Sequence, residues 1–443
     1  MFRKLLFGAG GLGASLFAAT AAFAQAAAEA PPTVDKGDTA WMMVSTILVL
    51  LMIMPGLALF YGGLARTKNM LSVMTQVGAA SALAMIVWVC WGYTQAFGDG
   101  GNAVISGFGK AFLSGVTPAS TAATFSAGIA IPEYVFICFQ MTFAAITLAL
   151  VLGSVVERMK FSAVMVFGVL WLTLAYFPIA HMVWAGNGYF FGLGALDFAG
   201  GTVVHINSGV AALVACVILG KRIGYGKEVM APHSLTMTGI GTGLLWVGWF
   251  GFNAGSALEA NGSAALAMMN TFVGPAAAGL AWMLAERITG HKASALGFCS
   301  GIIAGLVAVT PAAGNSGPMG AIVLCFITSI ICFFAVTKLK AMLGYDDALD
   351  TFGIHGVGGI MGALGTGIVY SAALGGPSGE GWMGMGAQLL VQAEAVVATI
   401  VWTAVATVIS IYVAKLLTGL RVTEEVEREG LDLGEHGERA YNY

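Results

Sequence analysis

The sequence predicts an all-α polytopic membrane protein with eleven transmembrane helices. Three observations support this fold class: an apolar composition, a series of long apolar runs, and a one-sided distribution of basic residues. Of the 443 residues, 58% are hydrophobic and 9% are charged, whereas a soluble domain is roughly 25% charged. Glycine supplies 63 residues, as is typical of membrane helices whose backbones approach closely.

The apolar runs define the transmembrane domain, which we place at residues 25–416. Each run is long enough to cross about 30 Å of hydrocarbon as a helix. The expected spans are 41–63, 71–97, 132–154, 161–180, 202–220, 234–256, 263–285, 294–310, 318–338, 351–374 and 388–416.

The first 24 residues have the features of a secretory signal peptide. Arg3 and Lys4 precede an apolar stretch, and Ala22-Phe23-Ala24 is a small-x-small cleavage site before Gln25. We therefore expect residues 1–24 to be cleaved, with an uncleaved first span as the alternative. A cleaved chain would begin outside the cell.

Basic residues give the orientation, because cytoplasmic connections carry an excess of Lys and Arg. The opposite set of mature connections holds only Lys36 and Lys110. Alternate connections and the tail carry the rest: Arg66, Lys68, Arg158, Lys160, Lys221, Arg222, Lys227, Arg287, Lys292, Lys338, Lys340, Lys415, Arg421, Arg428 and Arg439. We predict a multi-pass protein of a bacterial inner membrane, with a periplasmic N-terminus and a cytoplasmic C-terminus.

The spans fall into two groups of five, divided by a polar hinge at residues 221–233. Because five is odd, two such groups must cross the membrane in opposite directions. This pattern predicts an inverted five-plus-five helix repeat with a final helix added. Inverted repeats commonly place their site at the repeat interface, near mid-membrane.

Two histidines occupy related places in the two halves. His205 follows the triplet ending at Asp197, and His355 follows the Ala-Leu-Asp triplet ending at Asp350. Helical rise places them about 12 Å and 8 Å beyond their acids, which leaves about 10 Å of axial distance to close. Ionisable side chains at membrane depth usually mark a functional pathway.

Two neutral imidazoles in line would give an apolar passage its polar lining. That lining suits a small neutral molecule or a proton relay, and a bis-histidine haem is the competing interpretation. The six cysteines lack CxxC spacing and indicate neither a zinc site nor disulfides.

Five stretches carry a family resemblance across the mature chain. They are PGLALFYGGLARTKN (55–69), FPIAHMVW (177–184), ALDFAGGTVVHINSG (195–209), GWFGFNAGSA (248–257) and DTFGIHGVGG (350–359). The chain resembles the ammonium transporter (Amt/Mep/Rh) family, and its bacterial branch in particular. The resemblance implies a homotrimer in a lipid membrane, with one pore through each protomer, and it implies no enzymatic activity, cofactor or nucleic-acid partner.

The resemblance also assigns roles to residues. It identifies His205 and His355 as the paired pore histidines, and Phe143 with Phe252 as the stacked gate at the outer mouth. The residues that match the outer ammonium-binding site are Trp184, Phe143 and Ser256, with the buried acid Asp197 beneath it.

These residue types suit ammonium chemically. An aromatic face attracts a compact cation by about 0.5–2 kcal/mol, and Ser256 can accept one N–H. An apolar bore disfavours the intact ion, so we expect deprotonation near the gate and passage of ammonia along the histidines. Asp197 has two open interpretations: a helix cap or part of a proton relay.

The tail, residues 417–443, is rich in acids with interleaved arginines. It is either a solvated cytoplasmic extension or, by resemblance, a regulatory segment where a PII-type signal protein docks. Two other functions compete with ammonium transport: an ammonium sensor without flux, and a channel for a neutral gas such as carbon dioxide. The presence of Trp184 and Ser256 disfavours the gas channel.

Overall fold

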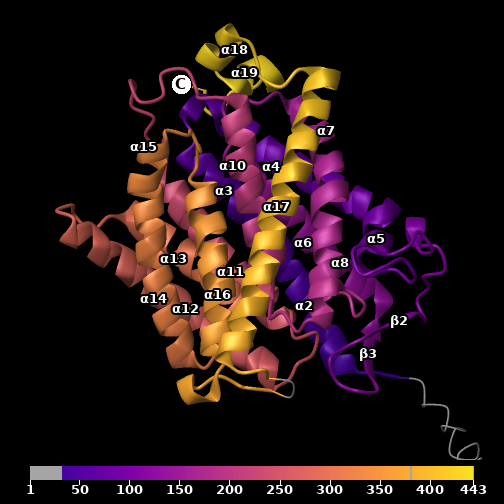
Figure 1. Ribbon diagram of the computed structural model, residues 1–443. Helices are drawn as coiled ribbons and strands as arrows, with labels where there is room; N and C mark the ends of the chain where they lie inside the picture. The colour runs from indigo at the N-terminus through magenta and orange to yellow at the C-terminus, as the bar shows by residue number, and fades with distance from the viewer. Residues whose placement is uncertain (1–31, 380–381, 443) are drawn as a thin grey trace, which may run out of the picture.

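The structure is a computed structural model and describes residues 32–379 and 382–442. Within these residues, eleven helices are long and apolar enough to cross a membrane, as predicted. They form one elongated bundle, with the start of α2 (Lys36–Leu51) and the end of the chain at opposite ends (Figure 1). The predicted signal peptide lies outside the described residues.

The first five spans are built from segments that include several π-helical turns. Their bounds are α2, η1 (Met52–Leu57) and α3 (Ala58–Leu64); η2 (Thr67–Asn69), α4 (Met70–Val87), η3 (Trp88–Gly92) and α5 (Tyr93–Phe97); α6 (Glu133–Leu152); α7 (Phe161–Trp171), η5 (Leu172–Tyr176), α8 (Phe177–Trp184) and α9 (Tyr189–Gly192); and η6 (Gly201–Ile206) with α10 (Asn207–Leu219).

The second five spans and the final helix follow the hinge. Their bounds are α11 (Leu235–Gly255); α12 (Gly262–Ile288); α13 (Ala295–Val309) with η7 (Thr310–Ala312); α14 (Pro318–Phe334), η8 (Ala335–Leu339) and α15 (Lys340–Leu343); η9 (Phe352–Gly356) with α16 (Val357–Val369); and α17 (Met385–Thr418). The final helix packs on α7, α10 and α16, so it covers both halves.

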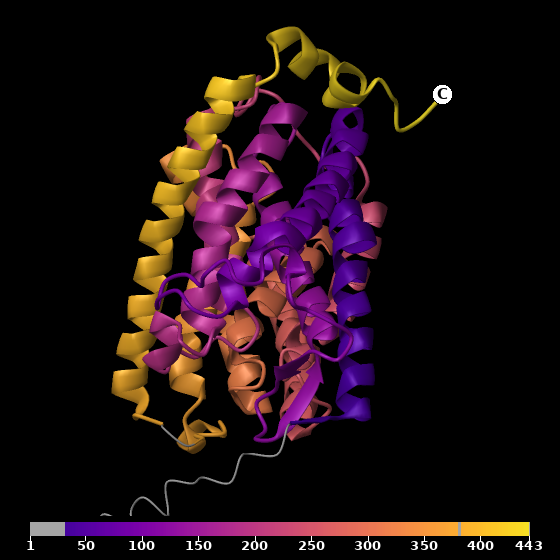
Figure 2. The ribbon, with the colours of Figure 1, turned by 90° about the vertical axis from the view of Figure 1, so that its right-hand side faces the viewer.

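A small three-stranded sheet lies at the end of the bundle away from the tail (Figures 1 and 2). Its order is β1 (Thr33–Val34), β3 (Ile129–Pro132), β2 (Thr121–Ala123), with β1 parallel and β2 antiparallel to β3. The sheet joins the start of α2 to the connection that leads into α6.

The tail folds back on its own chain. Its two short helices, α18 (Glu424–Glu429) and α19 (Leu431–His436), cover one end of the bundle (Figure 2). Asp432 accepts from the Ser72 N–H at 2.7 Å, and Glu435 accepts from the Phe161 N–H at 2.8 Å. Free N–H groups at a helix start need such partners, so the tail acids cap α4 and α7.

A buried ionic cluster joins the two halves beside the tail. Arg222 bridges Glu157 (3.1 Å) of the first half and Asp346 (2.8 Å) of the second. Burial disfavours ionised Glu157, but Arg222 and Arg66 outweigh burial and lower its pKa. Burial lowers the pKa of the neighbouring Arg158 to about 10. The cluster therefore ties the hinge to both repeats.

Candidate functional site

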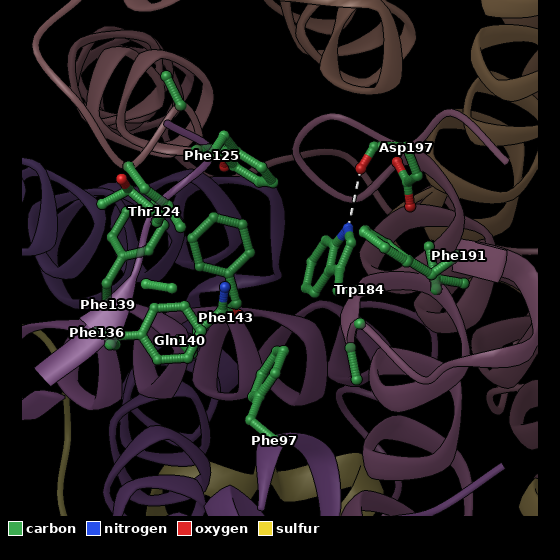
Figure 3. A pocket seen from close by; sticks show the side chains of 18 of the residues that line it. Phe97, Thr124, Phe125, Phe136, Phe139, Gln140, Phe143, Trp184, Phe191 and Asp197 are labelled. Atoms are coloured by element: carbon green, nitrogen blue, oxygen red, sulfur yellow. Dashed lines mark hydrogen bonds between the residues drawn. The ribbon is translucent and has the colours of Figure 1, made fainter. Parts of the chain in front are cut away.

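The residues predicted for cation binding line one open cavity of about 770 Å³, which we call the vestibule. It lies at the end of the bundle away from the tail, where α8 and α11 end. Phe143, Trp184, Asp197 and Ser256 are all among its lining residues. Figure 3 shows that aromatic side chains from several segments surround this space.

Hydrogen bonds hold Trp184 and Ser256 in place without using the indole face of Trp184 or the acceptor capacity of the Ser256 oxygen. The Trp184 indole N–H donates to the Asp197 carbonyl at 2.9 Å, drawn as the dashed line in Figure 3. The Ser256 hydroxyl donates to the Phe252 carbonyl at 2.8 Å. Since the hydroxyl hydrogen is used there, the Ser256 oxygen is left to accept an N–H from a cation in the vestibule.

Phe143 and Phe252 stack with ring centroids 4.1 Å apart and planes 11° apart. Both are buried, at 1% and 0% exposure. Phe143 lines the vestibule, whereas Phe252 lines a second, small cavity that contains the histidines. The stacked pair therefore separates the two cavities.

Phe139 is a vestibule residue that the sequence reasoning missed. It lies four residues before Phe143 on α6, with the two rings 4.9 Å apart. Residues four apart share one face of a helix. This spacing was the only sequence feature that could have indicated a shared site for Phe139 and Phe143, but an apolar helix contains many apolar pairs four residues apart.

The two histidines meet in the second cavity, which we call the histidine cavity. Their Nδ1 atoms are 3.2 Å apart and their rings lie 28° from parallel. The cavity holds about 10 Å³, which is space for about one water-sized molecule. The other lining residues are apolar: Met52, Leu57, Phe60, Ile146, Leu150, Leu245, Trp249, Phe252 and Ile303.

Close backbone packing brings the two histidine-bearing helices together. Gly209, four residues after His205, lies against Gly356, and a Cβ there would overlap the Gly356 backbone. In the other half Gly359, four residues after His355, lies against Ile206 and the Gly201 carbonyl, where a Cβ would be 3.0 Å away. This reciprocal contact closes the axial gap expected from the sequence.

Asp197 caps the helix that carries His205. Its carboxylate accepts from the N–H groups of four successive residues, from Gly200 to Val203, at 2.6–3.1 Å. Burial raises the pKa of Asp197 to about 6, although these four hydrogen bonds oppose the rise. The geometry matches the helix-cap interpretation, because both oxygens are occupied by backbone donors.

The repeat-related acid of the second half is Asp347 rather than Asp350, the residue suggested by the repeated triplet. Asp347 accepts from the Phe352 N–H at 2.7 Å and precedes His355 by eight residues, as Asp197 precedes His205. Asp350 instead pairs with Lys340. The triplet is therefore misleading, since the hydrogen-bonding role falls three residues earlier.

A haem between the two histidines does not fit this geometry. An iron atom and a porphyrin plane need far more room than a cavity of about 10 Å³ offers, and the two Nδ1 atoms are already in contact. Each neutral imidazole carries one N–H, so one Nδ1 donates and the other accepts. The pair then has one free N–H and one free nitrogen acceptor for a small polar molecule.

Known proteins match this chain over nearly its whole length. The model of the Ammonium Transporter Family matches residues 40–441. An ammonium transporter of Aquifex aeolicus (strain VF5) is 47% identical over 414 residues, covering 92% of this chain and 94% of the relative. An ammonium transporter of Bacillus subtilis (strain 168) is 46% identical over 410 residues, covering 92% and 99%.

Solved structures show the same fold. Saccharomyces cerevisiae Mep2 is 35% identical with a TM-score of 0.78, covering 89% of this chain and 96% of that one. A sensor Amt protein is 27% identical with a TM-score of 0.82, covering 90% and 98%.

Proposed function

The chain belongs to the ammonium transporter family, and from that premise we propose that it takes up ammonium through the path formed by the vestibule, the phenylalanine pair and the histidine cavity. The observation that carries the proposal is the order of these parts. A cation-attracting cavity, a closed aromatic pair and a small cavity with two histidines follow one another through the bundle.

Recruitment rests on Trp184, Phe143 and Ser256. The two aromatic rings lie edge to face, 5.7 Å between centroids, and an aromatic face attracts a cation most strongly where water is excluded. Ser256 offers one acceptor beside them. The cradle favours a small cation that can donate N–H bonds over a spherical metal ion.

Beyond the gate, ammonia is the species that suits the path. The histidine cavity is small and mostly apolar, and a buried ion that lacks compensation tends to lose its charge. Ammonium therefore gives up a proton near Phe143 and Phe252, and ammonia passes the histidines. The free N–H and free acceptor of the pair can serve ammonia in turn as it passes, with proton return outside or a separate proton transfer as two routes.

The proposed orientation, oligomeric state and partner follow from the sequence and from the exposed side chains. The basic residues of alternate connections support an orientation with the vestibule outside and the tail in the cytoplasm, and we infer a bacterial inner membrane. Exposed apolar side chains such as Ile47, Phe272 and Val323 leave faces for lipid and for two further copies in a homotrimer. The exposed acids Glu424 and Glu425 on the tail leave a surface for a PII-type partner.

A second function, ammonium sensing, is favoured by the fold similarity to a sensor Amt protein. A sensor needs the vestibule but no open route beyond the phenylalanine pair. Flux measurements therefore distinguish the two functions directly.

The test uses purified protein in liposomes with an inward ammonium gradient, recording internal pH and current. We expect flux above empty vesicles. Flux without current would identify net ammonia movement, and current that tracks ammonium would identify net charge movement. Binding without flux would contradict transport and favour the sensor.

A further inference from the structure

Trp249 contacts both the gate and the first histidine. Its ring stacks on His205 with centroids 5.4 Å apart and planes 25° apart, and it lies 5.6 Å from the Phe252 ring. The same indole lines the histidine cavity. Trp249 therefore connects Phe252 of the stacked pair to His205 of the histidine pair.

The His205 ring has few other constraints on its orientation. Among the described residues, its Nε2 has no hydrogen-bond partner, and its Nδ1 meets only the other histidine. A metal-binding or catalytic histidine is usually oriented by a carboxylate or carbonyl on its second nitrogen. Here stacking against two neighbouring rings, Trp249 and His355, limits rotation of the His205 ring.

Trp249 is in turn fixed by a hydrogen bond away from the path. Its indole N–H donates to Thr310 Oγ1 at 2.9 Å, and both residues are buried, at 2% and 0% exposure. The Thr310 hydroxyl hydrogen is within reach of the Leu306 carbonyl (2.7 Å) and of Asn253 Oδ1 (3.3 Å). The acceptor for the indole is thus itself held in place.

The chain of contacts extends to a third helix. Asn253 on α11 donates to Thr271 Oγ1 on α12 at 3.0 Å, while Thr310 begins η7 after α13. Buried polar groups that are fully hydrogen-bonded define one arrangement of a core, because any unpaired alternative is costly. Three helices therefore determine where the indole lies.

We propose that Thr310 is a positioning residue for conduction: it orients Trp249, and Trp249 fixes the His205 ring with its free nitrogen toward the path. The proposal rests on the proposed conduction past His205. It adds that conduction depends on a hydroxyl that does not line the histidine cavity.

Thr310→Val tests this proposal, because valine keeps the shape and removes the acceptor. We expect the maximum rate of ammonium flux in liposomes to fall by roughly tenfold, comparable with the loss of an outer partner of a metal-binding histidine. The apparent KM should stay within about twofold, because Trp184 and Ser256 are untouched. Thr310→Ser, which restores the hydroxyl, should regain most of the rate.

Thr242→Val is the matched control. Thr242 is buried on α11, and within the described part of the chain its hydroxyl bonds only the Thr238 carbonyl of its own helix, so this variant should conduct like wild type. The proposal is wrong if Thr310→Val matches Thr242→Val, or if Thr310→Ser is as slow as Thr310→Val. Absence of flux in wild-type protein would instead refute the proposed function.

A second pair of variants decides the matter if Thr310→Val does not fold. Trp249→Phe keeps a flat ring but removes the donor of the hydrogen bond to Thr310, so its maximum rate should fall about as much as expected for Thr310→Val. Trp249→Leu also removes the flat face and should be slower still, at unchanged KM. A wild-type maximum rate in Trp249→Phe would overturn the positioning role.

Discussion

Phe143 and Phe252 stack at 4.1 Å between the vestibule and the histidine cavity, so one pair of rings separates an open cavity of about 770 Å³ from a cavity of about 10 Å³. The two residues come from α6 and α11, one in each half of the repeat. The stacked pair is therefore a contact between the two halves, and in the proposed function both halves contribute to the gate.

Phe252→Ala should weaken the exclusion of ions. Removing one ring joins the two cavities and lets water follow the cation, which lowers the cost of moving charge inward. We expect more current per ammonium transported than in wild type. Phe250→Ala, whose ring packs on Phe272, is the control on the same helix, and an unchanged current ratio in Phe252→Ala would argue against the gate.

Gly209→Ala should destabilise the bundle. A methyl group at Gly209 meets the Gly356 backbone, which cannot rotate away, and overpacking of this kind costs about 1–3 kcal/mol. Thermal unfolding in detergent measures the effect. Gly386→Ala, at an open helical position, should be neutral or slightly stabilising; equal behaviour of the two would contradict the tight crossing.

Asp197→Asn separates the two interpretations of this acid. Asparagine has one acceptor oxygen where the carboxylate uses two, so N–H groups of the His205 helix lose partners. We expect unfolding free energy to fall by roughly 1–3 kcal/mol, and flux to fall with it. A variant of normal thermal stability without flux would support the relay instead; Glu429→Gln, at an exposed tail acid outside the vestibule, is the control.

Asp432→Ala should loosen the tail. The substitution removes the acceptor for the Ser72 N–H at the start of α4, and loss of a helix cap costs about 1 kcal/mol. Hydrogen–deuterium exchange over residues 424–440 should become faster. The same exchange rate as in Glu425→Ala, a change at an exposed tail acid, would show that the tail is held elsewhere.

Much of the fold was predictable because bilayer physics acts on every residue of a span. Apolar runs predicted eleven spans, and residues 32–379 and 382–442 contain eleven helices that are long and apolar enough to cross a membrane. Their ends were less predictable: the fourth span was expected at 161–180 and runs over Phe161–Gly192. Where a helix ends near the membrane surface depends on local packing, which the apolar content of the sequence does not reveal.

The site was predictable only in part. His205 and His355 stand out in sequence because ionisable groups in apolar spans are rare. Trp249 and Phe139 do not, because aromatic residues are common in membrane helices and their roles depend on which rings meet. Asp347 was missed for a similar reason: the hydrogen bond to the Phe352 N–H depends on the backbone path, and the repeated triplet pointed to Asp350.

The most direct measurement compares ammonium and methylammonium flux in liposomes for wild type, His205→Ala and His355→Ala. Removing either imidazole enlarges a cavity of about 10 Å³ and deletes half of its polar lining. We predict slower ammonium flux or a shift in selectivity toward the larger cation, while His291→Ala, at an exposed histidine, behaves like wild type. Wild-type rate and selectivity in both pore variants would contradict conduction past the histidine pair.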